Sequence, residues 1–118
     1  MTLKPQSTKV TLPSLTAPSW GELADDGQPV SVVVFECGET VYSYPYHTLA
    51  RWVLTPGAVD LLRIQAGKDE INIHGRNLTL ISQALGHARL RVLRATPERY
   101  AEATNMIFVS RISVEPNV

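Results

Sequence analysis

Short apolar stretches separated by turn-forming residues make up most of the chain from residue 30 onward. Runs of about four to eight β-branched and aromatic residues bounded by Gly, Pro, Asn or Asp are typical of β-strands. The pattern predicts strands over residues 30–35, 41–46, 51–54, 59–65, 70–74, 89–95 and 106–115. Because residues 51–54 extend the stretch before them, we count about six strands.

Two short helices are predicted late in the chain. The first is marked by Asn77, Leu78, Ile81, Leu85 and Gly86. In this set an N-cap asparagine precedes apolar residues at helical spacing, and a glycine stands where helices commonly end. The second helix is predicted over residues 96–103, because Thr-Pro-Glu supplies an N-cap, a proline at the first helical position and an early acid.

The alternation of residues also predicts which side chains share a face. In the strand after the first helix, Arg89 and Arg91 are expected on one face, and Leu90 and Val92 on the other. The last strand is expected to place four apolar side chains on one face: Met106, Phe108, Ile112 and Val114. Since strands joined by short loops pair antiparallel, the predicted fold class is α+β, with one curved, mainly antiparallel sheet that forms a roll or a partly open barrel.

The first 29 residues differ from the rest of the chain, since they hold four of its eight prolines. Proline fixes φ and removes a backbone donor, so residues 1–29 are predicted to be an extended arm or linker to a single domain over residues 30–118. Within the arm, Ser19 and Glu22 have the spacing of a capping box, which starts a helical turn. We expect Trp20 to be buried in its own subunit or in a neighbouring one, because an exposed tryptophan leaves much apolar surface in water.

Length and composition indicate one soluble domain. The chain has 118 residues, 44% of them hydrophobic, and its formal net charge is zero, which argues against a surface built as a whole for nucleic acid. The single cysteine excludes an intrachain disulfide and a cysteine-based zinc site, and it fits a reducing compartment. No apolar run is long enough for a signal-peptide core or a transmembrane helix. We therefore expect a cytoplasmic, bacterial protein without a membrane partner.

The sequence lacks the common motifs of catalysis. It contains no Gly-x-Ser-x-Gly elbow, no Walker loop and no Gly-x-Gly-x-x-Gly turn, and its three histidines lie on three predicted elements. No enzyme activity, cofactor or metal is expected. A nucleophile and base formed by Cys37 with His47 or His74 stays open, since it depends on the fold and not on spacing.

Arginines concentrate between residues 76 and 99, where Glu98 is the only acid. Guanidinium groups bind phosphate and carboxylate through paired hydrogen bonds, and the backbone after Asn77 would offer amide donors. The candidate ligand-binding residues are His74, Arg76, Asn77, Arg89 and Arg91. The same arginines are also accounted for as solvated partners of nearby glutamates. An anionic ligand is therefore the alternative partner, and nucleic acid is disfavoured by the zero net charge.

Three alternating tyrosines form the remaining candidate surface. Tyr42, Tyr44 and Tyr46 share one face of a predicted strand, separated by a serine and a proline instead of the basic residues typical of RNA-binding sheets. Together with Trp20 they are assigned to the core or to an interface. The sequence thus favours a small non-enzymatic binding or assembly domain that forms a homo-oligomer. The alternative is a binder of an anion, a phosphometabolite or a nucleic acid through the arginine-rich surface near residues 74–94.

Overall fold

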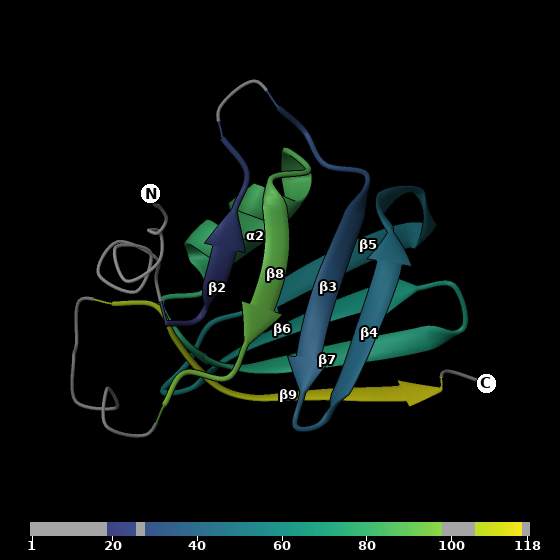
Figure 1. Cartoon of the computed structure of the whole chain (residues 1–118). Coiled ribbons are helices and arrows are strands. Elements are labelled where there is room, and N and C mark those ends of the chain that lie inside the picture. The colour runs from purple at the N-terminus through teal and green to yellow at the C-terminus, as the bar shows by residue number, and fades with distance from the viewer. Residues whose placement is uncertain (1–18, 26–27, 98–105, 117–118) are drawn as a thin grey trace, which may run out of the picture.

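The computed structural model describes residues 19–25, 28–97 and 106–116. In these ranges the chain forms two four-stranded sheets, one α-helix and one 3-10 helix (Figure 1). In spatial order, the first sheet consists of β2 (Gly21–Leu23), β8 (Leu90–Arg94), β3 (Val32–Cys37) and β4 (Thr40–Pro45). The second sheet consists of β5 (Leu49–Thr55), β6 (Asp60–Ala66), β7 (Asp69–Arg76) and β9 (Phe108–Pro116). The helix α2 spans Thr79–Gly86, and the 3-10 helix spans Tyr46–Thr48.

The α+β class and the dominance of antiparallel pairing are confirmed. All pairs of the second sheet are antiparallel, and in the first sheet β3 and β8 form the one parallel pair among the described strands. Other parts of the prediction were wrong: two sheets replace the single roll or partly open barrel, and the described residues hold eight strands instead of about six. The reason is that β8 pairs with β3 and not with β7, the strand that precedes it in the chain, so the strands form two layers.

The first predicted helix is confirmed as α2, although its start differs from the prediction. Asn77 has a φ of 59° and precedes the N-cap residue, which is Leu78. The Leu78 amide donates to a carboxylate oxygen of Asp60 at 3.2 Å, so an aspartate from β6 satisfies a donor at the start of the helix. Of the second predicted helix, residues 96–97 are not helical, and residues 98–103 lie outside the described part of the chain.

The end of α2 places an alanine in the left-handed conformation. Ala88 has a φ of 54°, its amide donates to the Leu85 carbonyl at 3.1 Å, and the Arg89 amide donates to the Ala84 carbonyl at 2.9 Å. These two bonds form a Schellman motif, in which glycine is the usual residue at the position of Ala88. Gly86, which the sequence predicted as the terminal glycine, is instead the last residue of the helix.

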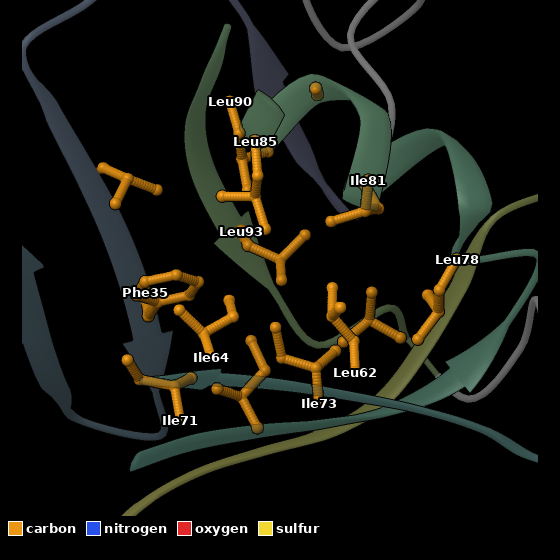
Figure 2. Close-up of a cluster of buried hydrophobic side chains, with 14 of the residues drawn as sticks. Phe35, Leu62, Ile64, Ile71, Ile73, Leu78, Ile81, Leu85, Leu90 and Leu93 are labelled. Atoms are coloured by element: carbon orange, nitrogen blue, oxygen red, sulfur yellow. The ribbon is translucent and has the colours of Figure 1, made fainter. Parts of the chain in front are cut away.

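The core fills the space between the two sheets and α2. Its fully buried side chains come from β3, β6, β7, β8, β9 and the helical segment, and Figure 2 labels Phe35, Leu62, Ile64, Ile71, Ile73, Leu78, Ile81, Leu85, Leu90 and Leu93. Each of them is at most 2% exposed. The alternation predicted for Ile71 and Ile73 is confirmed, and the burial of such apolar surface is the main favourable contribution to folding.

A β-bulge on β8 changes which side chains share a face. Glu22 pairs with Val92, and the next residue of β2, Leu23, pairs with Leu90, so Arg91 is an extra residue in β8. As a result Leu90 and Leu93 are both fully buried, whereas Val92 lines the outer surface of the sheet. The prediction that Leu90 and Val92 share a face was therefore wrong, because a bulge shifts the alternation by one residue.

A second bulge, at Ser110, has the same effect on β9. Phe108 pairs with Arg76, an outward-facing residue of β7, and the Arg76 guanidinium lies 5.0 Å from the centroid of the Phe108 ring. Ile112, beyond the bulge, belongs to the core cluster, and Phe108 does not. The prediction that Phe108 and Ile112 share a face was wrong for this reason.

The strand β2 lies within the predicted arm and pairs with β8 of the body. Trp20, directly before it, is 6% exposed and packs in the core of its own chain, which confirms the predicted burial. Glu22 lies in the strand, so the predicted capping-box turn was wrong. Gly21 has a φ of 151°, and a Cβ at this position would overlap the Val92 carbonyl oxygen, so only glycine permits this close pairing. The boundary of the arm at residue 29 stays a prediction.

Candidate functional site

Three of the predicted ligand-binding residues, His74, Arg76 and Asn77, lie on β7 and directly after it. The Asn77 side-chain amide donates to the Met106 carbonyl at 2.8 Å, and the Arg76 guanidinium covers the ring of Phe108. These contacts hold the end of β7 against the start of β9. The Nδ1 atom of His74 is buried and has no hydrogen-bond partner among the described residues.

The other two predicted ligand-binding residues lie on different parts of the molecule. Arg89 precedes β8, and its guanidinium donates to the Ala24 carbonyl at 3.0 Å. Arg91 lies at the bulge of β8 and lines the outer face of the first sheet. The structure thus brings His74, Arg76 and Asn77 together on the second sheet and places Arg91 on the first. Their use as one ligand site stays a prediction.

The residues considered for nucleophilic catalysis are separated in the fold. Cys37 ends β3 and packs against the core, and burial raises the pKa of its thiol, which lowers the thiolate fraction. His47 is exposed in the 3-10 helix, and His74 lies on the outer face of the second sheet. Within the described ranges, no group of three or more His, Cys, Asp and Glu side chains is arranged to hold a metal ion.

The tyrosine row faces the second sheet, inside the molecule. Tyr44 and Tyr46 pack against the core. Tyr42 lies on the same face of β4 as Tyr44, and its cross-strand partner is Phe35 of β3. The Tyr44 ring centroid lies 6.1 Å from that of Phe35, and its hydroxyl donates to Asp69 Oδ2 at 2.8 Å, which joins β4 to β7. Burial, followed by the hydrogen bond to Asp69, raises the pKa of Tyr44. These side chains connect the layers of their own chain, and an interface formed by them and Trp20 stays a prediction.

A broad hollow lies over the outer face of the first sheet, the face that Figure 1 turns toward the viewer. Its volume is about 490 Å³. It is lined by Glu22, Pro29, Val30, Ser31, Val32, Val34, Arg91 and Val92, and we call it the valine hollow. The segment before β3 and the strands β2, β3 and β8 all contribute to it.

The floor of the valine hollow is apolar because of the bulge on β8. The extra residue, Arg91, turns Val92 outward beside Val34, its partner on β3. Val32 on the same face of β3 is 39% exposed. Val34 and Val92 are half-buried, so the floor consists of one exposed valine and two half-buried ones.

Two charged side chains border the valine hollow. Glu22 and Arg91 are exposed, and neither forms an ion pair within the described part of the chain. By contrast, Arg94 on the same sheet donates to both carboxylate oxygens of Glu36, at 3.1 and 3.5 Å. Glu22 and Arg91 therefore remain available to complementary charges on a ligand.

A smaller hollow lies on the outer face of the second sheet and has a volume of about 180 Å³. It is lined by Arg51, Val53, Arg63, Gln65 and Glu70, and we call it the arginine hollow. Arg63 and Glu70 approach to 3.7 Å, an exposed ion pair of little strength. Arg51 forms no ion pair within the described ranges, so one guanidinium is available to an anion.

Sequence reasoning identified neither hollow. Arg51 and Arg63 lie outside the arginine-rich stretch, and the pairing of β5 with β6 brings them onto one face. The alternation of these two strands was the signal that could have placed them there. Val92 was assigned to the wrong face because the bulge at Arg91 leaves no mark in the local sequence pattern.

The side chains that line the two hollows are mostly valines and charged or amide-bearing residues. Neither set contains a thiol, an imidazole or a hydroxyl held beside a base. In the described part of the chain, no helix has the length and apolar character needed to cross a membrane. No protein-family model, no curated protein and no solved structure matches the chain, so its own side chains are the basis for assigning a function.

Proposed function

We propose that this chain is a cytoplasmic, bacterial, non-enzymatic binding domain whose partner site is the valine hollow. The observation that carries the proposal is an outward apolar floor, formed by Val32, Val34 and Val92, beside two charges that pair with no other described residue. Apolar surface in water is unfavourable, and covering it contributes roughly 25 cal/mol per Å². A partner that fills the hollow gains this contribution.

The proposed partner is an extended protein segment that carries an aliphatic side chain between charged residues of both signs. The aliphatic side chain contacts the valines, a basic residue meets Glu22, and an acidic residue meets Arg91. The apolar contact supplies affinity, and the charges supply specificity and a faster association rate. A small metabolite fits less well, because such sites have several polar groups converging on one point.

The test is selection from a displayed library of random peptides, followed by mapping of the bound peptide by NMR. We expect enriched peptides with an aliphatic residue flanked by charges, and shifts concentrated on Val32, Val34 and Val92. The substitution Val32→Lys should weaken binding at least about tenfold, because it places a charge on the apolar floor.

The matched control is Val53→Lys on the second sheet, where the valine is 42% exposed compared with 39% for Val32. This variant should bind the selected peptides as the unmodified protein does. Absence of enriched peptides, or shifts that map away from the valine hollow, would refute the proposal.

A second candidate function is anion binding in the arginine hollow, favoured by Arg51, which forms no ion pair with a described residue and lies beside Arg63. Tripolyphosphate serves as the probe. Binding should weaken as salt rises and should fall at least about threefold in Arg51→Gln, which keeps the side-chain length approximately and removes the charge. Binding that is unchanged in Arg51→Gln, or absent at low salt, would eliminate this function.

A further inference from the structure

The strand β9 borders the second sheet and, at nine residues, is its longest strand. It pairs with β7 on one side, and no described strand pairs with its other side (Figure 1). The free edge of a long strand presents unpaired amides and carbonyls, which form a template for another strand.

Two features limit the part of this edge that another strand can use. The Val109 amide donates to the Thr96 hydroxyl at 2.9 Å, and the Val109 carbonyl accepts from the Thr96 amide at 2.7 Å. Pro116, at the other end of the strand, has no amide to donate. The usable window is therefore residues 110–115.

Within this window the side chains are arranged symmetrically about Ser113. Arg111 lies two positions before it and Glu115 two positions after it, and both are exposed. Ile112 and Val114 flank it and contact the core. An antiparallel copy of this strand with its Ser113 opposite Ser113 would therefore place Arg111 against Glu115, and Ile112 against Val114, twice each.

The backbone geometry permits this register. In an antiparallel pair, alternate residues direct both backbone groups to the same side of the strand. When a residue pairs with its own copy, every other facing pair consists of residues whose numbers differ by an even amount. The backbone amides and carbonyls that point away from β7 on one strand therefore face those that point away from β7 on the other. A register centred on Ile112 would place Glu115 opposite Val109, whose backbone groups already bond to Thr96. A register centred on Val114 would place Ser113 opposite Glu115. Ser113 is therefore the centre that pairs the charges.

We propose that the free edge of β9 binds β9 of a second copy of this chain, antiparallel and centred on Ser113. The two second sheets then form one continuous sheet across a two-fold axis, with an Arg111–Glu115 pair on each side of it. The valine hollow lies on the other sheet and shares no residue with this edge, so self-association and partner binding there can succeed or fail independently.

Disulfide trapping tests the register. In antiparallel pairs opposite Cα atoms lie about 4.5 to 5.5 Å apart, a separation that a disulfide spans. In a Cys37→Ser background, Ser113→Cys should form a disulfide-linked dimer in a glutathione buffer. Val53→Cys, on the β5 edge of the same sheet, is the control and should remain monomeric under the same conditions. Equal or faster linkage of the Val53→Cys variant would refute the β9 register.

Charge reversal tests the pairing energy by analytical ultracentrifugation of the full chain. Arg111→Glu and Glu115→Arg should each weaken dimerisation about tenfold, because each makes two cross-strand pairs repulsive. The double variant, which exchanges the two charges, should restore the dimer. A monomer at millimolar concentration, or a dimer insensitive to both single reversals, would overturn the proposal.

Discussion

The hydroxyl of Tyr46 makes two hydrogen bonds to the backbone of one residue, Leu90. It donates to the Leu90 carbonyl at 2.8 Å and accepts from the Leu90 amide at 3.1 Å. Leu90 is the first residue of β8, and the described pairing of β8 with β3 begins two residues later, at Val92. The Tyr46 hydroxyl therefore satisfies the Leu90 amide and carbonyl at a position where β3 does not pair with β8.

We expect Tyr46→Phe to lower the free energy of unfolding by about 1 to 3 kcal/mol, because it leaves a partly buried amide and carbonyl unsatisfied. Urea denaturation followed by circular dichroism provides the measurement. Tyr42→Phe is the matched control, since the Tyr42 hydroxyl forms no hydrogen bond within the part of the chain that the structure describes, and it should change stability by less than about 0.5 kcal/mol. Equal losses in both variants would contradict this role for Tyr46.

Stability should also fall at alkaline pH through the same side chain. Burial raises the pKa of Tyr46 to about 12, although the hydrogen bond to the Leu90 backbone acts in the opposite direction. An unfolded tyrosine titrates near a pKa of about 10. Because the folded state holds the proton more tightly, this contribution is fully present below pH about 10 and is lost as the pH rises toward about 12.

The measurement is a series of urea transitions across this pH range. Tyr46→Phe should reduce the alkaline slope but not abolish it, since Tyr44 also has a raised pKa from burial and its bond to Asp69. A slope unchanged by the substitution would assign the alkaline loss to other groups.

The end of α2 offers two stabilising substitutions. Ala88→Gly should raise stability by about 0.5 to 1 kcal/mol, because glycine adopts the left-handed conformation of the Schellman position without steric cost. Gly86→Ala should add a similar amount, since glycine disfavours helices and the new Cβ would lie 3.9 Å from the Trp52 ring, an ordinary contact. Thermal unfolding of the two single variants and of the double variant measures these gains. A destabilised Ala88→Gly protein would show that this helix end is held by other contacts.

The glycines before β3 and after it should differ sharply in their tolerance of alanine. Gly21→Ala should destabilise the fold by more than about 2 kcal/mol and expose Trp20, because its Cβ overlaps the Val92 carbonyl and pushes β2 from β8. Gly38→Ala meets no atom within 4 Å and should cost only about 1 kcal/mol for its positive φ of 63°. Tryptophan fluorescence and urea denaturation report both effects. A Gly21→Ala protein as stable as the Gly38→Ala protein would contradict the close pairing of β2 and β8.

Features set by neighbouring residues were predictable from the sequence, and features set by distant pairing were not. The turn at Gly38, the alternation of Ile71 and Ile73, and the existence of α2 all follow from local pattern. The bulges at Arg91 and Ser110 were not predicted, because each depends on the partner strand. The left-handed conformation of Ala88 was not predicted, because Gly86, two positions earlier, matched the glycine that usually marks the end of a helix.

The candidate surfaces were missed on the same grounds. Each hollow combines side chains from strands that the sequence alone could not place side by side. Arg91 was singled out for its charge, yet its structural importance lies in turning Val92 outward.

The parallel pairing of β3 with β8 makes the first sheet a late product of chain synthesis. When synthesis has reached Gly86, the end of α2, the chain contains β5, β6 and β7. It does not yet contain Val92, which pairs with Val34 in the floor of the valine hollow. A nascent or truncated chain therefore lacks part of the valine hollow, the surface that we propose for partner binding. A partner that prefers the finished surface stabilises the native state by mass action, and so discriminates in favour of chains that have folded to completion.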